Sequence, residues 1–128
     1  MIKHWNEFQG SPNRVAKDQP RVTINSRGVI LLNREAFESM DGPAAVKLLF
    51  DEGNNIIGLK PADIRLNNAF PFKQKDKWHN RLIHASPLLK HHNIRIDRTV
   101  LFNEVTIDAD GVMKLELSKT TAIGRGRW

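Results

Sequence analysis

The chain has 128 residues, with 20 Lys and Arg against 14 Asp and Glu, and a net charge of +6. This length suffices for one domain with a hydrophobic core. The fraction of apolar residues, 40%, is above the range of disordered chains. No apolar run approaches the roughly 20 residues of a membrane-spanning helix, so no membrane association is expected. The lack of cysteine excludes disulfides and thiolate chemistry. Together with the absence of a signal-peptide pattern, it predicts a cytoplasmic location.

Composition divides the chain into three segments. Residues 1–20 mix Asn, Gly, Ser, Pro and Lys without a hydrophobic period, which is typical of a flexible N-terminal arm. Residues 21–118 contain helix and strand patterns and are expected to form a single globular domain, composed of two similar halves at 21–62 and 70–118. Residues 119–128 contain three bases and are predicted to form a basic flexible tail.

The first half is predicted to be two short strands, a helix and a hairpin. Gly28 separates the two strands. Asn33 is a typical helix N-cap residue, and Gly42 followed by Pro43 ends the helix, because glycine adopts a left-handed cap and proline cannot continue a helix. Alternating apolar residues on both sides of the polar residues 51–55 predict the hairpin.

The second half repeats this order. Ser86 is predicted as the N-cap of a second short helix, with Pro87 at its first position. A strand is expected over residues 100–107. Its alternation changes parity near Asn103 and Glu104, which predicts a bulge there. A turn at Gly111 then leads into a returning strand.

These elements indicate a mostly β (α+β) protein of antiparallel hairpins with two short helices. The duplicated strand–helix–hairpin order would form either a small barrel or two packed sheets. The apolar positions of the predicted strands and of the first helix give the expected core: Ile24, Ile30, Leu32, Phe37, Leu48, Phe50, Ile57, Leu59, Phe102, Val105, Ile107, Leu115 and Leu117.

The positive charge is concentrated in residues 73–98, which contain two acids and seven bases. The bases are Lys73, Lys75, Lys77, Arg81, Lys90, Arg95 and Arg98. If their side chains converge on one face, that face would attract a polyanion such as nucleic acid. The alternative interpretation is that these bases form a solvated face that serves only solubility.

Aromatic residues alternate with the first lysines of this segment. On an extended segment Lys73, Lys75 and Lys77 project from one side and can follow a phosphate backbone. Phe70, Phe72 and Trp78 would then stack on exposed bases, although core packing accounts equally well for the two phenylalanines. Arg125 and Arg127 in the tail form a second candidate contact, since a flexible arginine arm can enter a minor groove.

Patterns for catalysis, metal binding and cofactor binding are lacking. His79, His84, His91 and His92 do not have the spacing of a helical ligand pair, and Pro87 prevents one helix from joining them. No nucleophile elbow and no glycine-rich phosphate loop occurs. We therefore expect no metal, no cofactor and no enzymatic activity.

Residues 22–61 resemble the swapped-hairpin DNA-binding domain of AbrB-type transition-state regulators and antitoxins. The resemblance lies in Val22-Thr23, Arg27-Gly28, Ile30, Leu32, Arg34-Glu35, Met40, Val46, Leu48, Ile57, Leu59 and Pro61. It implies that Arg27 and Arg34 contact DNA. It also implies that one chain with two copies supplies both halves of a barrel that the family builds from two chains.

The sequence therefore predicts a small basic nucleic-acid-binding protein, in the role of a transcriptional regulator. The alternative is a protein interaction or assembly module without catalytic activity, which forms a homo-oligomer or binds an acidic protein partner. Binding through several phosphates would be distinguished by a steep dependence on salt.

Overall fold

The computed structural model describes residues 19–75, 77 and 79–123. Nearly all of the predicted N-terminal arm, Trp78 of the predicted stacking residues, and Arg125 and Arg127 of the tail lie outside the described residues.

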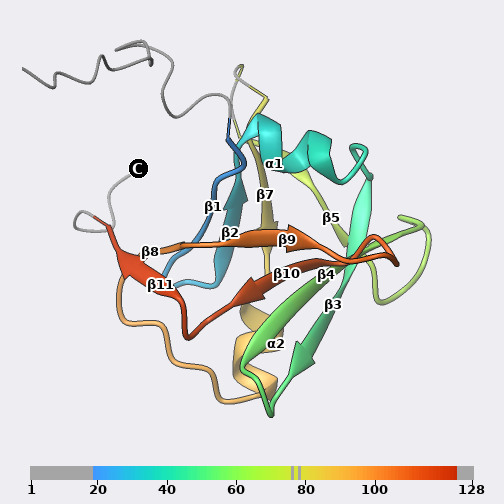
Figure 1. Cartoon of the computed structure of the whole chain (residues 1–128). Helices are drawn as coiled ribbons and strands as arrows, with labels where there is room; N and C mark the ends of the chain where they lie inside the picture. The colour runs from blue at the N-terminus through green and yellow to red at the C-terminus, as the bar shows by residue number, and fades with distance from the viewer. Residues whose placement is uncertain (1–18, 76, 78, 124–128) are drawn as a thin grey trace, which may run out of the picture.

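Two antiparallel sheets form the body of the molecule (Figure 1). In spatial order the first sheet contains β11 (Thr120–Ala122), β8 (Val100–Phe102), β1 (Val22–Ile24), β2 (Val29–Leu32), β7 (Arg81–His84) and β6 (Lys73–Gln74). The second sheet contains β5 (Phe70–Pro71), β3 (Ala45–Asp51), β4 (Ile56–Ala62), β10 (Met113–Glu116) and β9 (Val105–Ile107). Within the described ranges there is no closed barrel, so the mostly β prediction is confirmed in its two-sheet form.

Two short helices follow equivalent strands and lie at opposite ends of the molecule (Figure 1). They are α1 (Arg34–Ser39), which follows β2, and α2 (Ser86–His91), which follows β7. β2 pairs with β7 and β4 pairs with β10. In the order β1-β2-β7-β6, two strands from residues 21–62 are followed by two strands from residues 70–118. The order β3-β4-β10-β9 has the same arrangement. Each sheet therefore joins strands from residues 21–62 to strands from residues 70–118.

Side chains from both sheets form one core. The predicted core residues that are buried are Ile24, Ile30, Leu32, Ile57, Leu59, Phe102 and Leu115. The others are only half-buried: Phe37, Leu48, Phe50, Val105, Ile107 and Leu117. The exposure has local causes, since β9 is an edge strand and Phe50 and Leu117 line an open cavity. Core residues that the prediction omitted include Val22, Val46, Ile83 and Met113.

The helix starts differ from each other in their capping. Asn33 caps α1 as predicted, because its Oδ1 accepts a hydrogen bond from the backbone N–H of Ala36 at 2.9 Å. The predicted cap at Ser86 is wrong. α2 already begins at this residue, and Ala85 occupies the cap position without a side-chain hydrogen bond. Ala85 packs in the core, so its position is determined by tertiary packing instead of by a capping side chain.

Two predicted boundaries in the C-terminal part were also wrong. The strand expected over 100–107 is divided into β8 and β9, which belong to different sheets. The parity change at Asn103 and Glu104 therefore marks the passage of the chain between sheets and not a bulge within one strand. The tail expected from residue 119 starts too early, because β11 pairs with β8.

Candidate functional site

Three cationic side chains meet around an open groove beside α2. Arg27 comes from the turn between β1 and β2, Lys90 from α2, and Arg95 from the segment that follows this helix. The groove has a volume of about 530 Å³. We call it the basic groove; its lining is completed by Ser26, Ser86, Leu89, Asn93, Ile94 and Ile96. No Asp or Glu is among these lining residues.

The β1–β2 turn holds Arg27 against the start of α2. The Asn25 Oδ1 atom accepts hydrogen bonds from the backbone N–H groups of Arg27 at 2.9 Å and Val29 at 3.0 Å. Gly28 follows with φ of 82°, and its carbonyl accepts a hydrogen bond from Ala85 N–H at 2.8 Å. The turn therefore lies directly on the beginning of the helix.

The end of α2 places Lys90 and Arg95. Asn93 has φ of 57°, and its N–H donates to the carbonyl of Lys90 at 3.4 Å. The N–H of Ile94 donates to the carbonyl of Leu89 at 2.8 Å, which completes a Schellman motif. After this reversal Ile94 packs against the core while Arg95 is exposed, so the chain leaves the helix with the guanidinium in solvent.

The three cations of the basic groove are not neutralised within the described part of the chain. None of them forms an ion pair or a side-chain hydrogen bond there. Arg34 differs, because its Nε donates to Glu38 at 2.9 Å. This hydrogen bond and the nearby charge raise the pKa of Arg34. A neutralised arginine has less attraction for an external anion than an unpaired one.

Arg81 and Arg34 form a second group, beside α1. The Arg81 guanidinium lies over the Phe37 ring at 4.6 Å from its centroid, and its Nη1 is buried without a hydrogen-bond partner. A hollow of about 380 Å³ includes both arginines together with Glu38 and Asp41. The two carboxylates offset the positive charge here, unlike in the basic groove.

Lys73 and Lys75 form a third group, on the outer face of the first sheet. Lys73 lies opposite Leu82, whereas Arg81 lies opposite Gln74 and Leu32. Residues opposite each other in a ladder share a face, and successive residues alternate between faces. Arg81 is therefore on the core face.

The bases of residues 73–98 are therefore distributed over several faces of the molecule. Lys75 contributes to a small hollow on the outer face, and Lys77 lies in the turn after β6. Arg98 lies beyond the basic groove and lines a larger cavity. Phe72 of the proposed stacking residues packs edge-to-face on Phe37 at 5.0 Å, which favours its core interpretation over base stacking.

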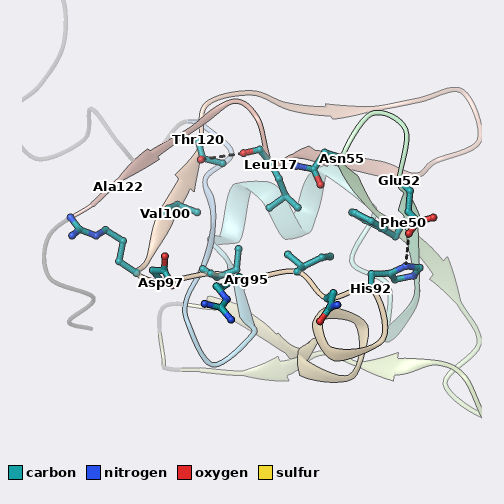
Figure 2. Close-up of a pocket in the computed structure, with 14 residues that line it drawn as sticks. Phe50, Glu52, Asn55, His92, Arg95, Asp97, Val100, Leu117, Thr120 and Ala122 are labelled. Atoms are coloured by element: carbon teal, nitrogen blue, oxygen red, sulfur yellow. Dashed lines mark hydrogen bonds and ion pairs between the residues drawn. The ribbon is translucent and has the colours of Figure 1, made fainter.

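This larger cavity has a volume of about 710 Å³ and lies between the segment after α2 and the turns of the second sheet (Figure 2). Phe50 and His92 meet at one end, with ring centroids 4.7 Å apart. The His92 Nδ1 atom is 3.9 Å from a Glu52 carboxylate oxygen. Arg95 borders both this cavity and the basic groove.

Sequence reasoning missed a fourth set of bases, on the outer face of the second sheet. Lys47 lies directly opposite Lys60, and Lys114 lies opposite Gly58 in the neighbouring ladder. The alternation of β3 could have indicated this set, because Lys47 stands between the buried Val46 and the half-buried Leu48. The pairing across strands could not be read from local sequence.

The described residues give no sign of a metal centre or a membrane span. No group of three or more His, Asp or Glu is placed to hold an ion in ranges 19–75 and 79–123. No helix of the described chain is long and apolar enough to cross a membrane.

Comparison of the chain with family models, with curated proteins and with solved structures gave no match.

Proposed function

We propose that this protein binds nucleic acid in the cytoplasm, with the basic groove as the site of phosphate contact. One observation supports this most: three unpaired cations from separate segments surround a groove that no carboxylate lines. Phosphate oxygens attract such cations regardless of base sequence. The hydroxyls of Ser26 and Ser86 in the same lining are suited to donate to further phosphate oxygens.

The role as a transcriptional regulator rests on the resemblance to AbrB-type domains. That resemblance implies a DNA contact at Arg27, and Arg27 is the base that the β1–β2 turn holds in the basic groove. Arg34, the other implied contact, is paired with Glu38. We therefore assign the contact to Arg27 and not to Arg34.

Binding across a salt series tests the proposal. Fluorescence anisotropy with labelled duplex and single-stranded oligonucleotides should show that log K falls linearly as log salt rises. Replacing Arg27, Lys90 and Arg95 together by Gln removes three phosphate contacts and should reduce the slope by about 2 to 3. Stability should change little, because exposed charges contribute little to folding.

A matched control has the same change in net charge at a different face. It replaces Lys47, Lys60 and Lys114 by Gln on the outer face of the second sheet. This variant should retain nearly the wild-type slope. Equal losses in both triple variants would show a response to net charge alone and would contradict the assignment of the groove. If the wild type binds neither nucleic acid at low salt, the proposed function is wrong.

An assembly module is the second candidate function, because three large apolar side chains are exposed among the residues that the structure describes. They are Leu49 on β3 and Ile64 and Leu66 in the loop after β4, with relative exposures of 42%, 53% and 45%. Self-association that is insensitive to salt and is abolished by Ile64→Ser with Leu66→Ser would favour it. Light scattering after size-exclusion chromatography measures this directly. Tight binding of polyglutamate in place of nucleic acid would instead indicate an acidic protein partner.

A further inference from the structure

The cavity and the basic groove are separated only by the segment 93–96. All four of its residues line both hollows. Figure 2 shows the Arg95 guanidinium on the side of this segment away from Leu117, while Leu117 projects into the cavity. A phosphate held by Arg95 therefore lies next to the cavity mouth. A ligand role for the cavity rests on the proposed function, because the ligand is part of a nucleic acid whose phosphates lie in the basic groove and continue toward the cavity mouth.

The cavity walls suit a flat ring with polar edges. Phe50 and His92 offer aromatic faces at one end. Ile94, Val100 and Leu117 add apolar surface, and each is half-buried against the core. Nucleobases stack on aromatic side chains and tolerate apolar contacts, whatever their sequence. The volume of about 710 Å³ lies within the range of pockets that enclose small organic groups.

Two unpaired side-chain amides border the same space. Asn55 and Asn93 form no side-chain hydrogen bond within the described residues. Both have left-handed backbones, with φ of 59° and 57°. An amide offers donors and an acceptor, which match the donor and acceptor edges of a base. Asn55 and Leu117 face the segment with His92 and Arg95 across the cavity, so a base there would have amide, apolar and aromatic neighbours (Figure 2).

We infer that this cavity accepts an unpaired base of a single-stranded nucleic acid whose phosphates contact the basic groove. A base in a duplex is already stacked and paired, and its extrusion costs free energy that a single strand does not pay. The protein therefore binds single strands in preference to duplexes of the same length.

Affinities for two short oligomers of equal phosphate number test this inference. One is oligothymidylate and the other contains abasic residues at every internal position. At one salt concentration the wild type should bind oligothymidylate about 5- to 100-fold more tightly, as expected for stacking of one base on aromatic rings. The single strand should also exceed its duplex in affinity. Equal binding of the two oligomers would overturn the inference while the salt-dependent phosphate binding of the proposed function remained intact.

Substitutions in the cavity locate the effect. Phe50→Leu keeps apolar volume but removes the ring, so oligothymidylate affinity should fall toward that of the abasic oligomer, whose affinity should not change. Phe37→Leu is the matched control, because it removes a half-buried ring from α1, outside the cavity lining. The inference would be overturned if Phe50→Leu kept the wild-type ratio of oligothymidylate affinity to abasic-oligomer affinity. It would also be overturned if both variants lost the same amount of oligothymidylate affinity.

A second variant guards against misfolding of Phe50→Leu. Asn55→Gly removes an exposed amide, and glycine suits the positive φ at this turn. It should weaken oligothymidylate binding several-fold and leave abasic binding unchanged. Unchanged binding of oligothymidylate by this variant would count against the placement of the base. If no oligomer binds the wild type at all, the proposed function fails together with the inference.

Discussion

At the scale of single residues, Gly28 determines how close Arg27 lies to the second half of the chain. A Cβ atom at this position would lie 2.8 Å from both the N and the Cα of Ser86. Its φ of 82° is in addition a conformation that residues with a side chain rarely adopt. Glycine therefore satisfies two separate requirements, one of backbone conformation and one of space.

A pair of substitutions separates these two requirements. Gly111 has nearly the same φ, 83°, but apart from its chain neighbours no described residue has an atom within 4 Å of its Cβ position. Gly111→Ala should cost only the left-handed conformation, about 1–2 kcal/mol. Gly28→Ala should cost about 1–3 kcal/mol more, because the turn must move off α2. Urea unfolding of both variants measures the difference. Equal losses in the free energy of unfolding would show that the β1–β2 turn can move away from α2 at no cost.

Displacement of the β1–β2 turn has a second consequence, for binding. Arg27 reaches the basic groove only because this turn lies on α2. Gly28→Ala should therefore weaken oligonucleotide binding even under conditions where the variant is fully folded, whereas Gly111→Ala should not. Stability and binding are thus linked through one backbone contact.

At the scale of elements, the β3–β4 hairpin shows how register distributes burial. Leu48 and Leu59 lie directly opposite each other, yet Leu59 is fully buried and Leu48 is half-buried. β4 is a central strand with β10 on its other side, whereas β3 is followed only by the two-residue β5. The neighbouring strands, and not the residue type, account for the difference.

This difference predicts unequal costs for the same substitution. Leu59→Ala should destabilise the protein by about 2–5 kcal/mol, the range for a leucine removed from a packed core. Leu48→Ala should cost about half as much, because less apolar surface is lost from burial. Thermal or urea unfolding compares the two. A larger loss for Leu48→Ala would show that the inward faces of the hairpin are wrongly assigned.

Elements defined by local signals could be predicted from the sequence, and their partners could not. The cap at Asn33 and the turn at 51–55 depend on residues close in the chain, and both occur as expected. The passage between sheets at Asn103 depends on β1 and β10, whose pairing with β8 and β9 no local pattern specifies. A parity change is the same local signal for a bulge and for a change of sheet.

The candidate site shows the same limit. The individual bases could be named as candidates from the sequence, but the basic groove joins Arg27 to Lys90 and Arg95 across more than half of the domain. Their meeting depends on the pairing of β2 with β7, which brings the β1–β2 turn to α2. Arg81 and Lys73 lie on opposite faces of the first sheet, because successive residues of a strand alternate between faces. The sequence could have indicated this only if the bounds of β7 had been known.

At the scale of the whole molecule, the two halves of the domain are interleaved. Each sheet contains one interior pair with a strand from each half, β2 with β7 in the first sheet and β4 with β10 in the second. β8 of the second half also pairs with β1. Residues 21–62 taken alone would expose the partner edges of β1, β2 and β4. Unpaired edges and an open core are unfavourable in water.

This interleaving predicts that the domain folds as one cooperative unit, and that neither half folds without the other. A polypeptide of residues 19–68 and another of 69–123 should each lack a cooperative thermal transition by circular dichroism, because the core side chains of each half bury against those of the other. Mixing the two should restore β structure and the transition, since the pairs β2·β7 and β4·β10 can form between separate chains. The basic groove draws Arg27 from the first polypeptide and Lys90 and Arg95 from the second, so salt-dependent oligonucleotide binding should return only in the mixture. A cooperative transition in either polypeptide alone would mean that the inter-half ladders are dispensable for folding, and binding by one of them alone would place the phosphate contacts outside the groove.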